Sequence, residues 1–155
     1  MRLLRLLALV VLATSTLALA AGASTAGTAP GVRVGTAELR PVAAGGPEGV
    51  AYARQAGRRV TGWLVVWGLE PGSTHAWHFH GPRGACTPAA RNRGVVAGGP
   101  DLTADENGVA FLRFRITSDT TVVARGFYVN VHEQSTPGGV GAGITCGNIQ
   151  AFRVR

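Results

Sequence analysis

The chain of 155 residues contains no lysine, few aromatic residues and few charges. Its 15 basic residues are all arginine, aromatic residues make up 6% of the chain, and charged residues make up 15%, against about a quarter in an average soluble protein. No apolar period of 3.6 residues is sustained beyond the N-terminus. These deficits exclude a coiled coil and a multidomain enzyme, and an apolar content of 46% excludes a disordered chain. The 23 glycines and 8 prolines between short apolar runs are typical of a small β protein.

The N-terminus has the pattern of an export signal. Arg2 and Arg5 precede an apolar stretch at 6–19, and positions 18–20 form a small-x-small cleavage site. This pattern predicts a signal peptide over residues 1–20. An N-terminal membrane anchor is the alternative, but the apolar stretch is short for a span. We expect a secreted, extracytoplasmic protein with no stable membrane insertion after cleavage.

The rest of the chain is expected to form a flexible leader, residues 21–31, and one domain, residues 32–155. Two of the 15 arginines lie in the signal, so 13 arginines face 8 acidic residues, which gives a net charge of +5. The arginines are scattered, and no run is longer than Arg58-Arg59, so we expect no nucleic-acid partner. A weak attraction for small anions remains.

Seven segments have the composition and alternation of β-strands. They are Val32–Leu39, Gly49–Arg54, Arg59–Leu69, His75–His80, Val109–Ile116, Thr121–Val131 and Ile144–Val154. Turn residues such as Pro71-Gly72 and Asn107-Gly108 separate them. Seven or eight short strands predict a Greek-key sandwich or barrel. Residues 81–104 and 133–143 show no strand pattern and are expected to be functional loops.

The two cysteines, Cys86 and Cys146, both lie in the part of the chain that is expected to be exported. An even pair in an oxidising compartment most simply forms one disulfide. Two free thiols that serve a metal are the alternative.

Three of the four histidines fall within one strand-like segment, residues 74–80. Because successive side chains on a strand alternate between its faces, His78 and His80 share one face and Trp77 and Phe79 share the other. The aromatic pair is expected in the core, so the two histidines point away from it. His75 has the opposite parity to His78 and is expected to be a buried structural histidine, hydrogen-bonded through both ring nitrogens.

The fourth histidine, His132, ends the run Phe127-Tyr128-Val129-Asn130-Val131. The odd-numbered residues of this run form the apolar set, so His132 also points away from the core. A His-x-His pair on one strand and a third histidine on another can hold copper or zinc. The alternative is an exposed β face that carries histidines and binds no metal.

Five motifs resemble those of the copper/zinc superoxide dismutases. They are Gly68-Leu69-Glu70-Pro71-Gly72 leading to His75-Ala76-Trp77-His78-Phe79-His80, then Gly84-Ala85-Cys86-Thr87, Leu102–Ala110, Val129-Asn130-Val131-His132 and Ile144-Thr145-Cys146-Gly147-Asn148-Ile149. The resemblance runs from about Val32 to Val154. It implies an eight-stranded Greek-key β-barrel or sandwich and a disulfide between Cys86 and Cys146.

The same resemblance implies a copper site. It maps the copper ligands onto His78, His80 and His132, and it places His75 where a family histidine braces the site without touching copper. The substrate that it implies is superoxide or another small anion. The oligomeric state is left open.

The chain also departs from the family pattern. Its segment 81–104 contains no histidine, and Asp101 is the only acidic residue there. Neither the histidine that bridges copper and zinc nor the zinc site is therefore expected. Gly143 stands where the family has an arginine that guides the substrate. Arginines of the same segment could partly restore this attraction; they are Arg83, Arg91 and Arg93.

A second resemblance is to the chordin-type (CHRD) domain, whose signature is similar to Tyr128–His132 followed by Pro137-Gly138-Gly139, and which also carries a His-x-His-Gly strand like His78–Gly81. Two hypotheses follow. The first is an exported, copper-dependent superoxide dismutase-like oxidoreductase without a zinc site and with reduced efficiency. The alternative is a non-catalytic metal-binding or CHRD-like extracellular interaction domain.

Overall fold

The computed structural model describes residues 31–81, 86, 94–134 and 141–154. These residues form ten strands and no helix. The strands are β1 (Val32–Pro41), β2 (Glu48–Ala56), β3 (Arg59–Trp67), β4 (Thr74–His80), β5 (Val95–Gly98), β6 (Leu102–Thr103), β7 (Ala110–Thr117), β8 (Tyr128–Gln134), β9 (Gly143–Asn148) and β10 (Gln150–Val154). The described residues therefore contain no apolar helix of the length that a membrane crossing requires. The proposed signal peptide and leader, up to residue 30, lie outside them.

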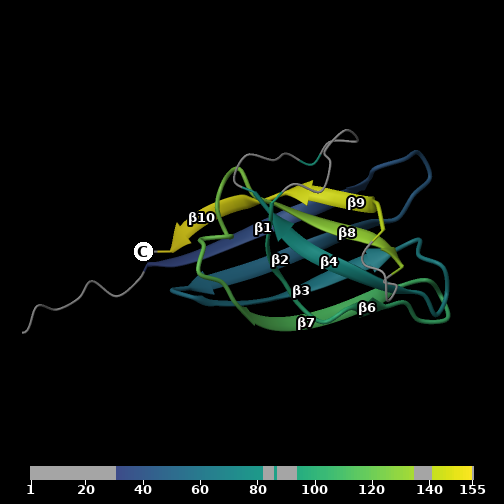
Figure 1. The fold of residues 1–155 in the computed structure, drawn as a ribbon, viewed down its shortest axis with the longest axis horizontal. Coiled ribbons are helices and arrows are strands. Elements are labelled where there is room, and N and C mark those ends of the chain that lie inside the picture. Colours follow the sequence, from purple (N-terminus) through teal and green to yellow (C-terminus); the bar gives the residue numbers. More distant parts are fainter. Residues whose placement is uncertain (1–30, 82–85, 87–93, 135–140, 155) are drawn as a thin grey trace, which may run out of the picture.

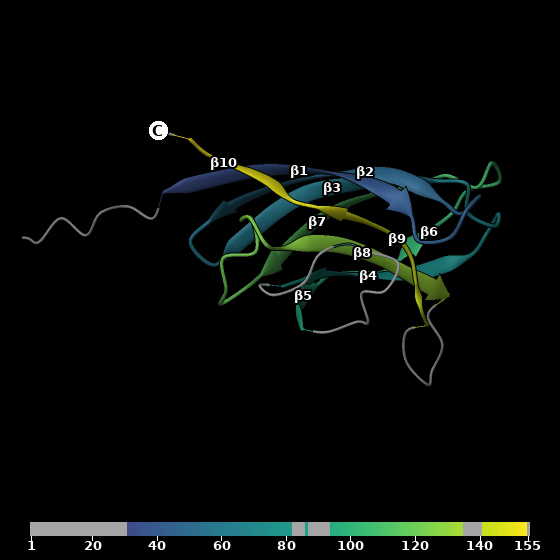
Figure 2. The ribbon, with the colours of Figure 1, turned by 90° about the horizontal axis from the view of Figure 1, so that it is seen from above.

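The strands form a nearly closed antiparallel barrel that is flattened into two layers (Figures 1 and 2). Eight strands follow the order β5-β4-β8-β9-β1-β2-β3-β7, while β10 pairs with β1 and β6 pairs with β4. We call the layer of β10, β1, β2, β3 and β7 the β1 sheet, and the layer of β9, β8, β4, β5 and β6 the β4 sheet. Neighbours such as β3 and β7, or β4 and β8, are not consecutive in the chain, which is the hallmark of Greek-key connections. The predicted all-β fold is confirmed.

The core lies between the two sheets and follows the strand alternation. On β4, Trp77 and Phe79 are fully buried, and on β8 the same holds for Val129 and Val131. Leu64 of β3 faces them from the other sheet and is also fully buried. The parity that the sequence predicted for β4 and β8 is therefore confirmed.

Three strand predictions were wrong in detail. Residues 121–127 are not part of β8: Val122 and Val123 are buried, and the Val123 amide donates to the side-chain Oε1 of Gln55 instead of to a backbone carbonyl of a neighbouring strand. The segment 81–104, predicted to be a loop, contains β5 and β6. The last predicted strand breaks at Ile149, where the chain leaves β8 and joins β1.

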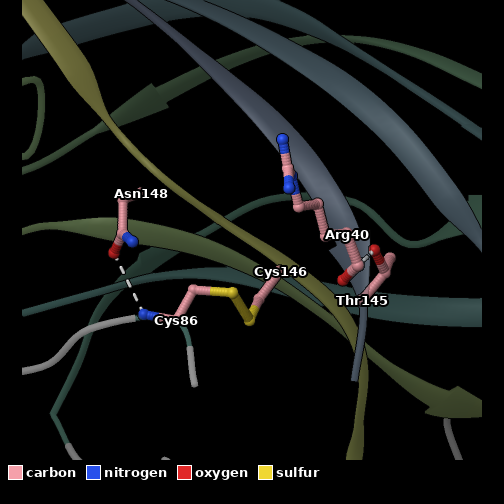
Figure 3. The surroundings of a disulfide bond; sticks show 5 residues. All are labelled: Arg40, Cys86, Thr145, Cys146 and Asn148. Atoms are coloured by element: carbon pink, nitrogen blue, oxygen red, sulfur yellow. Dashed lines mark hydrogen bonds between the residues drawn. A yellow bond between two sulfur atoms is a disulfide. The ribbon is translucent and has the colours of Figure 1, made fainter. Parts of the chain in front are cut away.

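A disulfide joins Cys86 to Cys146 of β9, with Cα atoms 5.5 Å apart (Figure 3). The backbone amide of Cys86 also donates a hydrogen bond to Asn148 Oδ1, at 3.0 Å. β9 itself is tied to β1, because Thr145 Oγ1 donates to the carbonyl oxygen of Arg40. The predicted disulfide is confirmed, and a disulfide is more typical of extracellular proteins than of cytoplasmic ones.

Candidate metal centre

The candidate centre lies on the outer face of the β4 sheet, where β4 and β8 run side by side. The two aromatic residues of β4 fill the core, so His78 and His80 point to the opposite side. On β8 the register shifts between Val131 and His132. Such irregularities re-aim the side chain that follows, and His132 joins the pair from β4.

The three rings converge. One ring nitrogen from each of His78, His80 and His132 lies within 4.8 Å of the other two, and His78 Nδ1 is 3.2 Å from His132 Nε2. Two nitrogen ligands that each lie about 2 Å from one ion, at tetrahedral or trigonal angles, are about 3.3–3.6 Å apart. The spacing of the three rings therefore fits a single metal ion after small ring rotations.

The tautomer of His132 is fixed by the chain. Its Nδ1 lies 3.0 Å from the carbonyl oxygen of Gly141, which can only accept a hydrogen bond, so Nδ1 carries the proton. The lone pair of Nε2 then points at His78, whose Nδ1–H donates to it. Binding of a metal through His78 Nδ1 would displace this proton, whereas His132 already has the tautomer that a ligand needs for binding through Nε2.

Burial favours the neutral form of both rings. Desolvation lowers the pKa of His78, the nearby His132 lowers it further, and Asp101 partly offsets this. Desolvation also lowers the pKa of His132, and the hydrogen bond to the carbonyl oxygen of Gly141 partly offsets this by raising it. Because metals bind neutral imidazole, the lowered pKa values keep both ligands available at neutral pH.

His75 belongs to the core side and braces the centre. It is only 5% exposed. Its Nδ1 donates to the carbonyl oxygen of His132, at 2.8 Å, and its Nε2 lies 2.7 Å from Ser73 Oγ. The prediction of a buried histidine bonded through both ring nitrogens is confirmed. The ring holds the backbone of one candidate ligand without joining the group.

Tyr128 of β8 belongs to the centre and was missed in the sequence. Its ring stacks on that of His80, with centroids 5.0 Å apart and planes 15° apart. Both side chains are at most 1% exposed, and burial raises the pKa of the Tyr128 hydroxyl. The sequence did contain a sign of this position, since Tyr128 and His132 are four residues apart on one strand and therefore point to the same face. The stacked ring fixes the plane of His80.

Two residues of the segment before β7 also reach the centre. Gly98 lies opposite His78 on β5, and a Cβ atom added there would lie 2.6 Å from His78 Cδ2. Glycine is therefore required for the observed position of this ring. Asp101 lies near enough to raise the pKa of His78. Neither role could be predicted, because the segment 81–104 was expected to be a loop and its position against β4 was not known.

Gly143, at the position where the family resemblance implies an arginine in other members, packs against Asn130. A Cβ atom at 143 would lie 2.6 Å from Asn130 Oδ1 and 2.7 Å from Nδ2. Asn130 is 4% exposed and lies opposite His78 on the neighbouring strand. The side chain of Asn130 thus occupies the space that a larger residue at 143 would need.

Among the residues that the structure describes, His78, His80 and His132 are the one group of three or more potential ligands close enough to hold an ion. The predicted steering residues Arg83, Arg91 and Arg93 lie outside the described residues. The donor set is three imidazoles, which suits copper, zinc and other borderline divalent metals. No model of a known protein family matches the chain, and no curated protein matches it.

Proposed function

We propose that the protein is an exported copper-binding protein of the superoxide dismutase-like type, with copper held by His78, His80 and His132. The observation that carries this proposal is the convergence of the three imidazoles within 4.8 Å on the outer face of β4 and β8. The family resemblance of the sequence motifs supports the same three ligands and the same fold.

The ligand chemistry favours copper over zinc. The group found in the described residues has three ligands, which does not fit a structural zinc site closed by four protein ligands but does fit a copper site or a zinc site with one open position. Among divalent first-row metals, imidazole sites bind Cu²⁺ most strongly. The buried rings of His80 and His132 are held by Tyr128 and Gly141, which leaves half-buried His78 on the side nearest to solvent.

The activity that we propose is slow dismutation, in which one superoxide is oxidised to oxygen and a second takes up an electron and two protons to give hydrogen peroxide. Bound copper would supply the one-electron redox couple. The chain supplies the fixed tautomer of His132 and favours the neutral forms of His78 and His132 at neutral pH. With no histidine in residues 81–104 to carry protons, water must deliver them, which limits the rate.

A non-catalytic metal-binding or CHRD-like role is the second candidate, and the structure of residue 143 favours it. Gly143 carries no charge, and Asn130 fills the space beside it. Without a positive charge at position 143 the site attracts anionic superoxide less, since electrostatic steering raises association rates by about 10 to 10³. A protein that stores or transfers copper has no need of such steering.

Copper binding to the exported protein, purified without a histidine tag, tests the proposal. We expect one Cu²⁺ per chain, with an electron paramagnetic resonance signal that shows nitrogen ligands. His132→Ala should weaken binding by at least about 100-fold, since one of three ligands is lost. Glu106→Ala, in an exposed turn, is the control. If His132→Ala binds copper as tightly as the parent, the ligand assignment is wrong.

Stopped-flow decay of superoxide separates the two candidates. The rate constant of superoxide decay should be higher with the copper-loaded parent than with His78→Ala at equal total copper. It should be lower than with an enzyme that has a complete copper–zinc site. A parent that binds copper but is no faster than the variant would support the non-catalytic role.

A further inference from the structure

A second surface, the outer face of the β1 sheet, carries most of the large apolar side chains that the described residues leave exposed. Six such side chains are at least 37% exposed, and five of them lie on this face: Trp63, Trp67, Phe111, Phe152 and Val154. The strand registers place them together, because residues opposite each other in antiparallel strands point to the same side. We call this surface the aromatic face.

The centre of the aromatic face is apolar across three strands. Tyr52 of β2 lies opposite Trp63 of β3, and their rings stack with centroids 6.0 Å apart. In the next row, Val50, Val65 and Phe111 lie side by side on β2, β3 and β7. Contiguous apolar patches of this kind on a soluble domain mark interaction sites.

The two ends of the aromatic face carry opposite charges. Arg54 and Arg115 lie in one row at the end where β2 finishes. Glu48 lies at the other end, opposite Trp67, and Glu38 lies one row nearer the middle, opposite Val50. Glu38 is paired with Arg40, whereas Arg54 and Glu48 take part in no ion pair within the described residues.

We propose that two copies of this chain associate through the aromatic face, about a two-fold axis that crosses the middle of β2 and β3. Such an axis lays each strand over its own copy in the reverse direction. It brings Arg54 over Glu48 of the second copy, twice in the dimer, and Trp63 over Val65 of the second copy. Sheets packed face to face cross at about 30°, and the long side chain of Arg54 spans this offset.

The composition of the aromatic face fits this partner. Tyrosine, tryptophan, phenylalanine and arginine are the residues enriched in protein–protein interfaces, and they dominate the binding energy. The Arg113 guanidinium already lies 5.9 Å from the Phe111 ring centroid of its own chain. The two-fold axis sets Arg113 over Phe111 of the second copy as well, so the pair forms a cation–π contact in both directions.

The size of the face is also adequate. Its five strands contain 41 residues, and at about 3.3 Å per residue and about 4.8 Å between strands they cover roughly 650 Å². A standard interface buries about 600–1,000 Å² per partner. An anionic membrane or polyanion is a poorer fit than a second copy, because Glu38 and Glu48 lie on the same face as the arginines, and a uniformly negative partner could pair with the arginines but not with the two glutamates.

Sedimentation equilibrium of the exported full chain tests the proposal. We expect a dimer with a dissociation constant in the micromolar range, and a blue shift of tryptophan emission as the dimer forms. Trp63→Asp should weaken association by about 30-fold or more, as expected at a hot spot. The matched control is Val95→Asp, because Val95 is the one large exposed apolar residue of the six that lies off this face.

Charge reversal identifies the axis. Arg54→Glu and Glu48→Arg should each weaken the dimer, and the double variant should restore it, because the pair is formed between copies. A chain that stays monomeric up to about 1 mM overturns the proposal, as does a dimer that Trp63→Asp leaves intact. Binding of the monomer to anionic vesicles or to a polyanion, lost in Trp63→Asp, would assign the face to that partner instead.

Discussion

The outer faces of the two sheets follow the same alternation and yet differ in what they expose. On the β1 sheet the outward residues include arginines and large aromatic side chains such as Trp63 and Phe111, and these two are more than a third exposed. On the β4 sheet the outward residues Tyr128 and His132 are at most 1% exposed. Alternation alone decides which side chains leave the core; whether they meet solvent depends on what lies over them. Buried polar side chains must be hydrogen-bonded or bind a ligand.

The two faces also differ in covalent linkage, because the one disulfide of the chain lies on the side of the β4 sheet, where it ties Cys86, six residues beyond His80, to β9. Replacing both cysteines by serine should lower the free energy of unfolding by about 4 kcal/mol, because the disulfide closes a loop of 60 residues and restricts the unfolded chain. Urea denaturation of parent and double variant measures this. The aromatic face should be unaffected, so a change in dimer affinity would contradict the separation of the two surfaces.

The second prediction concerns the space beside Asn130. Gly143→Arg would restore the charge that the family resemblance implies at this position, but its Cβ would lie 2.6 Å from Asn130 Oδ1. We expect a loss of about 1–3 kcal/mol in stability, typical of overpacking, and no gain in superoxide decay. Thermal unfolding and stopped-flow decay measure the two effects. A variant that is as stable as the parent and faster would show that this position can carry the missing charge.

A smaller effect is expected at Gly98, where a methyl group would lie 2.6 Å from His78 Cδ2. Gly98→Ala should displace the ring and weaken copper binding by about 10-fold, as changes next to metal ligands do. Isothermal titration with Cu²⁺ measures the affinity. Gly31→Ala is the matched control, because nothing lies within 4 Å of a Cβ at that position. Equal affinities in the two variants would mean that His78 is not a ligand.

Strand alternation is a local property, so the sequence predicted the all-β fold and the outward direction of the three histidines, whereas the family resemblance alone implied that they group together. Trp77 and Phe79 identified the face of β4 that points into the core, and the direction of the other β4 side chains followed from strand alternation. It did not predict β5, whose four residues are flanked by glycines and are held by pairing with β4. It also missed the stacking of Tyr128 on His80, since this contact depends on the pairing of strands nearly 50 residues apart. Long-range register is what a single sequence does not contain.

The smallest expected effect is a dependence of the free energy of unfolding on pH. It comes from the histidines of the β4 sheet, and the residues of the aromatic face should not contribute to it. Burial lowers the folded-state pKa of His78 and of His132 below the ordinary value of 6.5. As the pH falls through 6.5, the unfolded chain takes up protons first, so the free energy of unfolding decreases. The stabilisation is complete above about pH 6.5 and is lost as the pH falls through the folded-state values. Each histidine contributes a slope of at most about 1.4 kcal/mol per pH unit. Urea denaturation of the metal-free protein between pH 5 and 7.5 should show this slope, and His132→Gln should reduce it, whereas Trp63→Ser should not. A slope that survives in His132→Gln unchanged would contradict the assignment to this histidine.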